Sequence, residues 1–315
     1  MSDMRDTMRG QPAALRRVLL DVDGVASAAV RLRDRRVLLV GTGTSLHAAH
    51  QGAWLLHLAG VEAWAVPAAD VVGGGPAPSA GDGLVLLSHR GTKRDTTEVL
   101  RLAREAGVPS VVISKTGNPD ADLDTCEEER SAAFTASHLC ALLRLAQLAE
   151  ELGARLGALG EVPDAVAAEL DAGPSGVTLP SRLLEFVGSG INAWSAAEGA
   201  LKTRETSYLA CAGGNAEQFL HGPSVALGEG DTLVVLDGGG PGTARLEEVA
   251  AVVTAQGSTV HHIQRRDLGE ALSIFPLTTV VQKVAVEAAE ARGANPDSFG
   301  KDLPGRAAAW SRIQL

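Results

Sequence analysis

A group of polar and cationic side chains follows the apolar run at 84–87. The group comprises Ser88, His89, Arg90 and Lys93. At the carboxyl end of a buried parallel strand, such groups can give an anion charge-assisted hydrogen bonds. We therefore interpret Ser88, Arg90 and Lys93, with His89 beside them, as ligands of an anion. Arg94 is interpreted as an ordinary surface cation.

This local positive charge departs from the overall balance of the chain. The formal net charge is −10 over 315 residues. An acidic chain is a poor partner for nucleic acid, which favours a basic face, and for an anionic membrane surface. The cluster therefore indicates a small anionic ligand.

A second candidate for anion binding is the G-x-G turn at 41–43, which follows the apolar run at 36–40. Gly43 lets the backbone approach a ligand, and the hydroxyls of Thr44 and Ser45 can donate to phosphate oxygens. A dinucleotide site needs a third glycine and an acidic residue about 20 positions on. "GTGTSLH" lacks that glycine, and "VEAWAVP" at 61–67 ends without an acid. Nicotinamide binding is therefore disfavoured.

The elements that must position these residues alternate between strands and helices. Short apolar runs begin near residues 36, 61, 84 and 108, and helical patterns lie at 46–60, 96–107 and 131–157. Strands that are apolar throughout are typical of a parallel sheet covered on both faces. The sequence predicts an α/β fold with parallel sheets.

The pattern then restarts after a predicted connector at 161–177. "RLLEFVGSGINAWSAAEGALK" from 182 repeats "RVLLVGTGTSLHAAHQGAWLL" from 36, with glycines at a constant offset of 147 residues. We predict two similar doubly wound domains. The expected divisions are a helical segment at 1–34, a first domain at 35–160, a second at 178–295 and a tail at 296–315.

Composition indicates where in the cell the protein is expected and whether it should hold a cofactor. The three cysteines form no CxxC pattern, which indicates reduced thiols. The first residues carry no apolar signal core, and we expect no membrane-spanning segment and a cytoplasmic location. The eight histidines show no metal-ligand spacing, so we expect neither a metal nor an organic cofactor.

Several motifs together resemble the SIS (sugar isomerase) family, over nearly the whole chain. "VGTGTSLHA" resembles its C-G-T-S-x-x-A turn, "LSHRGTKRDT" stands in place of its L-S-Q-S-G-E-T-x-D-T phosphate loop, and "RSAAFTASHL" resembles its S-T-K-A-F-T helix start. Residues 196–227 resemble A-L-E-G-A-L-K-L-K-E-I-S-Y followed by H-G-P. The likeness is strongest to the isomerase domain of glucosamine-6-phosphate synthases and to stand-alone phosphosugar isomerases.

The resemblance implies two SIS (Rossmann-like) domains and a sugar phosphate bound between them near a subunit interface. It implies that Glu205 moves a proton between C1 and C2 and that His221 assists ring opening, often from the partner subunit. A partly buried carboxylate and a histidine suit these proton transfers. Further implied pocket residues are Gly43, Thr44, Ser45, Ser88, Ser131, Glu198 and Lys202. Helical spacing places Glu198, Lys202 and Glu205 on one face.

Three departures from the family pattern modify these expectations. The chain opens without the glutaminase domain of the synthases. The phosphate loop is rewritten at His89, Arg90 and Lys93, so the anion is a phosphate, a sulfonate or a carboxylate. The tail lacks the family's L-x-K-x-V-T lysine in register, leaving Lys301 or Arg306 to replace it.

The leading hypothesis is an aldose–ketose isomerase that acts on a phosphorylated or sulfonated sugar. The alternatives are a deglycase that cleaves amino-acid–sugar phosphate adducts, and a sugar-phosphate sensor without catalysis. The family implies a homodimer or a higher homo-oligomer.

Overall fold

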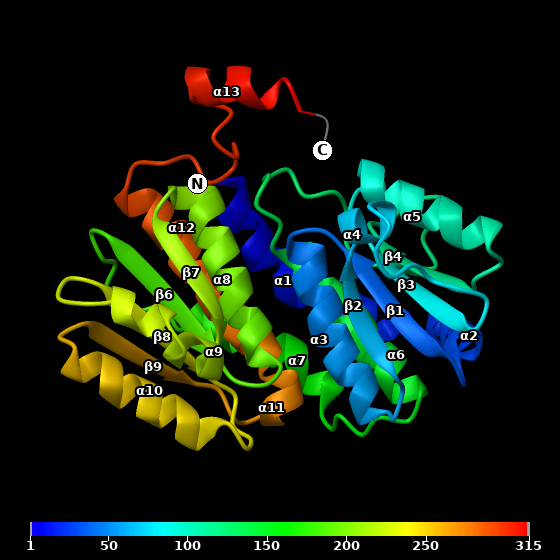
Figure 1. Cartoon of the computed structure of the whole chain (residues 1–315), viewed down its shortest axis with the longest axis horizontal. Helices are drawn as coiled ribbons and strands as arrows, with labels where there is room; N and C mark the ends of the chain where they lie inside the picture. The colour runs from blue at the N-terminus through cyan, green and yellow to red at the C-terminus, as the bar shows by residue number, and fades with distance from the viewer. Residues whose placement is uncertain (1, 314–315) are drawn as a thin grey trace. The chain divides into compact units, whose positions relative to one another are not determined.

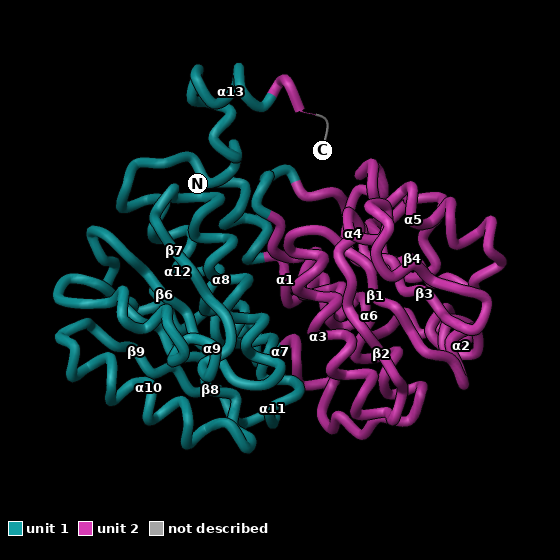
Figure 2. Tube along the Cα trace, in the orientation of Figure 1, with its two compact units in different colours: residues 1–9, 130–133, 164–310 teal, residues 10–129, 134–163, 311–315 magenta. Residues whose placement is uncertain are grey.

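The computed structural model describes residues 2–313, which fold into two compact units (Figure 2). The N-terminal unit, magenta in Figure 2, consists mainly of residues 10–129 and 134–163. The C-terminal unit, teal, consists mainly of residues 164–310 together with 130–133. Each unit is built on its own parallel sheet.

The N-terminal unit contains a parallel sheet with strand order β2-β1-β3-β4-β5. Its strands are β1 (Arg36–Gly41), β2 (Ala63–Pro67), β3 (Asp82–Leu87), β4 (Ser110–Ser114) and β5 (Leu123–Asp124). Strand β3 is buried along its whole length, and its apolar run at 84–87 is typical of such a strand. Its helices are α1 (Asp3–Leu20, whose first turns join the other unit), α2 (Asp23–Leu32), α3 (Thr44–Leu58), α4 (Ala68–Val72), α5 (Arg94–Glu105) and α6 (Ala136–Glu151).

Helices cover both faces of this sheet (Figure 1). Val40 and Leu86 pack in one core with side chains of α4 and α5. On the opposite face Leu39 lies near Leu145 of α6, and a Cβ at Gly52 of α3 would approach both leucines within 2.8 Å. The predicted α/β fold with helices on both sheet faces is therefore confirmed for this unit.

The C-terminal unit contains a second parallel sheet, with strand order β7-β6-β8-β9. Its strands are β6 (Leu183–Gly188), β7 (Ala210–Asn215), β8 (Thr232–Asp237) and β9 (Thr259–Gln264). Helices α8 (Asn192–Ser207) and α12 (Ile274–Ala291) share a core with one face of the sheet, and α9 (Ala216–Leu220) and α10 (Thr243–Ala255) share a core with the other. The remaining helices are α7 (Val162–Asp171), α11 (Gly269–Leu272) and α13 (Pro304–Trp310), with short 3₁₀ turns at Leu159–Glu161 and Pro223–Ala226.

The two G-x-G turns have the same local geometry. Gly43 and Gly190, which precede α3 and α8, have φ of 60° and 53°. A Cβ at Gly41 would lie 2.5 Å from the carbonyl oxygen of Ser45, and one at Gly188 would lie 2.2 Å from that of Asn192. The repeat therefore reflects a tight strand-to-helix turn that only glycine permits.

Two predictions about the connections were wrong. The predicted connector at 161–177 contains helix α7, with Pro163 in the first turn, where its missing N–H costs nothing. Strand β7 was not predicted, because its sequence ACAGGN has none of the large apolar side chains of the other strands. A Cβ at Gly213 would lie 2.3 Å from the carbonyl oxygen of Ala196, so α8 packs directly on the strand backbone.

The expectation that no segment could span a membrane also needs correction. The stretch Gly269–Ala291 is long and apolar enough by length and composition, and 89% of its apolar window is buried inside the protein. Core helices of soluble proteins meet the same criterion, so the stretch is weak evidence for a membrane span.

Candidate active site

The N-terminal unit has a small cavity at the carboxyl ends of β1, β3 and β4. Its predicted lining residues are Thr44, Ser45, Ser88 and His89. Lining residues that sequence reasoning missed are Ser114, Thr125, Ser137 and His138. The cavity lies where ligands bind in open parallel sheets.

His89 is held in a defined orientation inside this cavity. Its Nε2 accepts the backbone N–H of Glu129 at 3.3 Å, so its Nδ1 carries the proton. That Nδ1 is buried without a hydrogen-bond partner among residues 2–313. Burial lowers the pKa of His89, although Glu129 opposes the shift. His89 is therefore a neutral N–H donor next to the cavity.

Arg90 and Lys93 are not among the residues that line the cavity, contrary to the predicted ligand set. The Arg90 guanidinium lies 3.2 Å from a carboxylate oxygen of Glu128 and 5.1 Å from the ring centroid of Phe134. Lys93 is the N-cap of α5, and its carbonyl accepts the hydroxyls of two threonines. Arg94 is exposed and pairs with Asp95 at 2.9 Å, as expected of a surface cation.

Hydrogen bonds from Ser114 hold the backbone of the loop that carries Ser88 and His89. The Ser114 hydroxyl donates to the carbonyls of Ser88 at 2.7 Å and His89 at 3.1 Å, and it accepts the Asn118 amide at 2.7 Å. Gly91 has φ +69°, and a Cβ there would lie 2.3 Å from Asn118. These contacts position the loop that carries Ser88 and His89.

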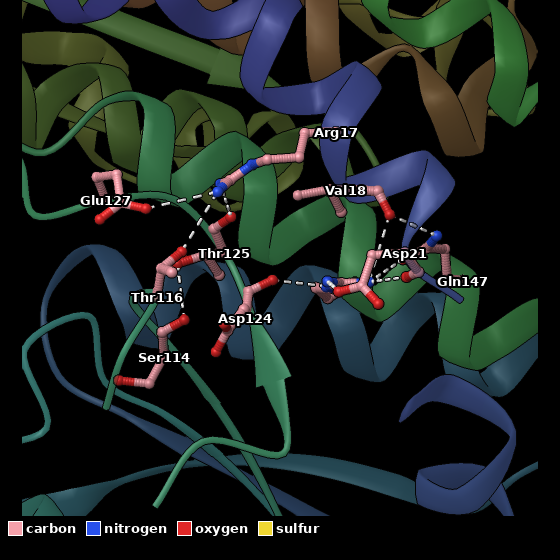
Figure 3. Close-up of polar contacts among 10 residues, drawn as sticks. Arg17, Val18, Asp21, Ser114, Thr116, Asp124, Thr125, Glu127 and Gln147 are labelled. Atoms are coloured by element: carbon pink, nitrogen blue, oxygen red, sulfur yellow. Dashed lines mark hydrogen bonds and ion pairs between the residues drawn. The ribbon is translucent and has the colours of Figure 1, made fainter. Parts of the chain in front are cut away.

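Two arginines hold the backbone at 124–125, next to the cavity residue Thr125 (Figure 3). Arg17 of α1 donates to the carbonyl of Thr125 at 2.6 Å. Arg144, only 2% exposed, donates to the carbonyl of Asp124 at 2.7 Å and pairs with Asp21 at 2.5 Å. The backbone that presents Thr125 to the cavity is therefore anchored to α1 and α6.

The corresponding strand end in the C-terminal unit has a different arrangement. Asp237, at the end of β8, is fully buried and accepts hydrogen bonds from Arg266, the Thr243 hydroxyl and the Gly239 N–H. A Cβ at Gly242 would lie 1.6 Å from the Ser189 hydroxyl. This strand end is filled by the protein's own side chains.

Helix α8 carries the predicted charged triad on one face. Lys202 lies with its Nζ 2.5 Å from Glu205 and 3.7 Å from Glu198. The exposed side-chain fractions are 0% for Glu198, 2% for Lys202 and 16% for Glu205. The lysine thus holds two carboxylates, and Glu205 is the one with access to solvent.

Glu205 borders a pocket of the C-terminal unit with an empty volume of about 760 Å³. Its other lining residues are Arg204, Tyr208, Phe299, Arg306 and Trp310. The Arg306 guanidinium lies 4.0 Å from the ring centroid of Tyr208, and Phe299 and Trp310 stack edge to face. The tail therefore brings Arg306 to the pocket of Glu205.

Lys301, the other predicted tail residue, is exposed and does not line that pocket. His221 is also exposed, at 72% of its side chain, and bonds Glu217 at 3.0 Å. Ser131 is fully buried, and its hydroxyl accepts the Ala133 N–H at 3.2 Å. Over residues 2–313 no group of three or more His, Cys, Asp or Glu side chains could hold a metal ion.

Comparison with known proteins now places the chain. Residues 32–151 match the family model of the SIS domain. This stretch is therefore similar to SIS domains. The predicted second SIS domain at 178–295 lies outside the matched stretch and stays a prediction.

Curated relatives agree with this assignment. The chain is 28% identical over 258 residues to glutamine–fructose-6-phosphate aminotransferase of Chlorobaculum tepidum, covering 74% of this chain and 42% of the relative. It is 26% identical over 312 residues to that of Pyrococcus horikoshii, covering 86% and 51%. The chain thus spans about half or less of the length of these relatives.

Solved structures share the fold over nearly the whole chain. Tagatose-6-phosphate ketose/aldose isomerase of Escherichia coli superposes with a TM-score of 0.80 and 22% identity, covering 94% of this chain and 95% of that one. Glucosamine-6-phosphate deaminase of Thermotoga maritima gives a TM-score of 0.78 and 18% identity, covering 94% and 97%. At these identities the likeness establishes the fold alone.

Proposed function

We propose that this protein is an aldose–ketose isomerase acting on a sugar that carries a phosphate or sulfonate terminal group. The observation that carries the proposal is the Glu205 carboxylate, held by Lys202 at the edge of a large pocket. A carboxylate at the edge of a pocket can take a proton from a bound sugar and return it. Relatives and structural neighbours with sugar-phosphate names support the same chemistry.

In the proposed reaction Glu205 takes the proton from C2 of the open-chain aldose. The electron pair forms the C1–C2 double bond of an enediol, and the carbonyl oxygen at C1 gains a proton. Glu205 then returns its proton to C1 while the hydroxyl at C2 loses one, giving the ketose. One carboxylate on one face of the sugar suffices, and no oxidant is needed.

The remaining residues have supporting roles in this proposal. Within the N-terminal unit, the cavity hydroxyls and the N–H of His89 suit the oxygens of an anionic group. His221 assists ring opening, and its exposure suits action in the site of a partner subunit. A homodimer or higher homo-oligomer and a cytoplasmic location are part of the same proposal.

A deglycase is the second candidate, and one observation favours it. The Glu205 pocket also holds Arg204 and Arg306, whose guanidinium groups could bind the carboxylate of an amino acid attached to the sugar. The proton transfers would again use Glu205. Release of an amino acid would identify this reaction, whereas an isomerase releases none.

The test is a thermal-shift screen followed by proton exchange. The panel contains fructose 6-phosphate, glucose 6-phosphate, glucosamine 6-phosphate, amino-acid–sugar phosphates and sulfoquinovose. A ligand of the native state raises the melting temperature. Each stabilising sugar is then incubated in D₂O, and NMR follows the C1 and C2 protons. Exchange supports an enzyme, whereas stabilisation without exchange contradicts it and indicates a sensor.

A further inference from the structure

Helix α3 of the N-terminal unit carries no fixed charge on any face. Its sequence, TSLHAAHQGAWLLHL, contains no Asp, Glu, Lys or Arg, whereas α5, on the other face of the sheet, reads RDTTEVLRLARE. The whole stretch 37–69 has a single fixed charge, at Glu62. A helix without a charged face is ordinarily buried on every side.

Part of α3 is nevertheless exposed, next to strand β2 (Figure 1). Trp54 and Leu58 lie one helical turn apart and are 39% and 52% exposed, and Trp64 of β2 is 56% exposed. The ring of His57, in the same turn of α3, meets Trp64 edge to face, with 6.1 Å between the ring centroids. We call Trp54, His57, Leu58 and Trp64 the α3–β2 patch.

The patch presents side chains and not a free strand edge, although β2 is an edge strand of its sheet. The Val37 N–H of β1 donates to the Glu62 carbonyl at 2.8 Å, so the backbone of Ala63 and that of Pro67 face away from β1. The outward Ala63 N–H donates to Nε2 of His57 at 3.3 Å, and Pro67 has no N–H. Addition of another strand is therefore opposed, and a partner would contact the patch through side chains.

The exposed side chains are of the kinds that form the centres of protein interfaces. Tryptophan is enriched there and charged residues are depleted. Trp54 and Trp64 are two of the four tryptophans in the chain. A large aromatic side chain buries about 150–250 Å², so their exposed fractions correspond to roughly 150–240 Å² of apolar surface per copy. With Leu58 added, this area suits the apolar centre of an interface of about 800 Å² per partner.

Charge indicates which partner fits the patch. The formal net charge of the chain is −10, so two copies repel each other wherever their acidic faces meet. Glu62 accepts the indole N–H of Trp64 at 3.2 Å, and the four patch residues themselves carry no fixed charge. An uncharged apolar face is complementary to another such face, and a two-fold axis places the same patch on both sides of one interface.

We propose that two copies of this chain form a symmetric dimer through the α3–β2 patch. The proposed function expects a homo-oligomer without assigning a face to it, and this inference extends that part of the proposal. It rests on the patch and not on the chemistry at Glu205.

The test is sedimentation equilibrium of the full chain over a range of concentrations. Leu58→Lys places a charge in the patch, and Leu20→Lys is the matched control, because Leu20 is also the last residue of its helix and is 84% exposed. We expect the wild type and L20K to dimerise equally. L58K should dimerise at least tenfold more weakly, since its charge would be buried without a partner. Trp64→Thr, which keeps a residue suited to a strand, should weaken the dimer as well.

Hydroxyl-radical footprinting with mass spectrometry locates the contact in the wild type. Oxidation of Trp54 and Trp64 should fall at least threefold between a dilute monomeric sample and a concentrated dimeric one. Oxidation of Leu20 should not change with concentration.

Each outcome supports or overturns the dimer contact. A wild type that is monomeric at every concentration overturns it, and so does a dimer that neither L58K nor W64T weakens. A dimer with unchanged oxidation of Trp54 and Trp64 assigns the contact to another face. If L58K does not fold, W64T and the wild-type footprint decide. Deuterium exchange on the same samples tests the isomerase proposal separately, because that proposal depends on Glu205.

Discussion

Substitution of Lys202 by methionine tests the charged triad of α8. Lys202 lies 2.5 Å from Glu205 and 3.7 Å from Glu198, and it is only 2% exposed. The Coulomb attraction between two opposite unit charges about 4 Å apart is about 4 kcal/mol at an effective dielectric constant near 20, before the cost of desolvation is subtracted. Removing one partner of a buried ion pair costs about 3–5 kcal/mol in practice. We expect K202M to lower the free energy of unfolding at pH 8 by about that amount.

The pH dependence of K202M distinguishes electrostatics from lost packing. Without the Lys202 ammonium group, the two carboxylates beside it are left without their cation in the folded variant. The folded variant then binds protons there at a pH at which the unfolded chain has already released them. Because the folded state then binds more protons, its stability rises as pH falls. The deficit relative to the wild type should therefore shrink between pH 8 and pH 5. A packing defect alone would leave the deficit unchanged.

Urea unfolding at several pH values measures this effect. Lys301→Met is the control, because Lys301 is exposed and should change stability by less than about 0.5 kcal/mol. A K202M variant within about 1 kcal/mol of the wild type at pH 8 would refute the assignment of a strong buried triad.

Three further substitutions test other parts of the structure by chemical unfolding. Burial raises the pKa of Glu185 from 4.5 to about 7, so the cost of its charge to folding grows between these pH values; E185Q should stabilise by roughly 2–3 kcal/mol at pH 8. Most of that gain should vanish by pH 5, and equal gains at both pH values would contradict it. Gly213→Ala should destabilise strongly, because its Cβ would lie 2.3 Å from a backbone oxygen, whereas Gly214→Ala has nothing within 4 Å and should be nearly neutral; similar costs for the two would be inconsistent with the packing of α8 on β7. Hydrogen bonds from Arg36 hold the pKa of Asp82 below its usual value, so D82N should cost about 2–3 kcal/mol at pH 7 and converge with the wild type as pH falls through that lowered pKa. A cost for D82N that stays constant as pH falls would rule out this ion pair as its source.

The sequence predicted the strands whose side chains bury on both faces. β1, β3 and β4 contain apolar runs and were expected within a few residues of where they lie, and β6 was expected from the repeat that begins at 182. β7 was not predicted, because its sequence has no large apolar side chains and its backbone at Gly213 lies against α8. Helix α7 was not predicted, because the proline and glycine residues in and after it are typical of a connector.

The cavity could be predicted only in part for a similar reason. Thr44, Ser45, Ser88 and His89 follow strands directly, so the topology alone brings them together. The pairing of Arg90 with Glu128, 38 positions later, depends on the fold of a loop and leaves no local pattern. Runs of acidic residues such as 127–129 usually indicate a solvated surface, and only the structure reveals that one of them is buried.

The role of Glu205 could be predicted mainly from the resemblance of its motif to the SIS family. Helical spacing placed Glu198, Lys202 and Glu205 on one face, which the structure confirms. The sequence could not decide whether Lys301 or Arg306 lies at this pocket, because the choice depends on how residues 299–310 fold. The aromatic pair of Phe299 and Trp310 then accompanies Arg306 into the pocket.

The most direct test of the account is deuterium exchange at C1 and C2 of a bound sugar, compared between the wild type and Glu205→Gln. Glu290→Gln, at an exposed glutamate of the same unit, serves as the control. We predict exchange in the wild type and in E290Q, and a loss of at least 10³-fold in E205Q while sugar binding is retained. Exchange at the wild-type rate in E205Q, with binding unchanged, would contradict the role of Glu205 as the proton-transfer base.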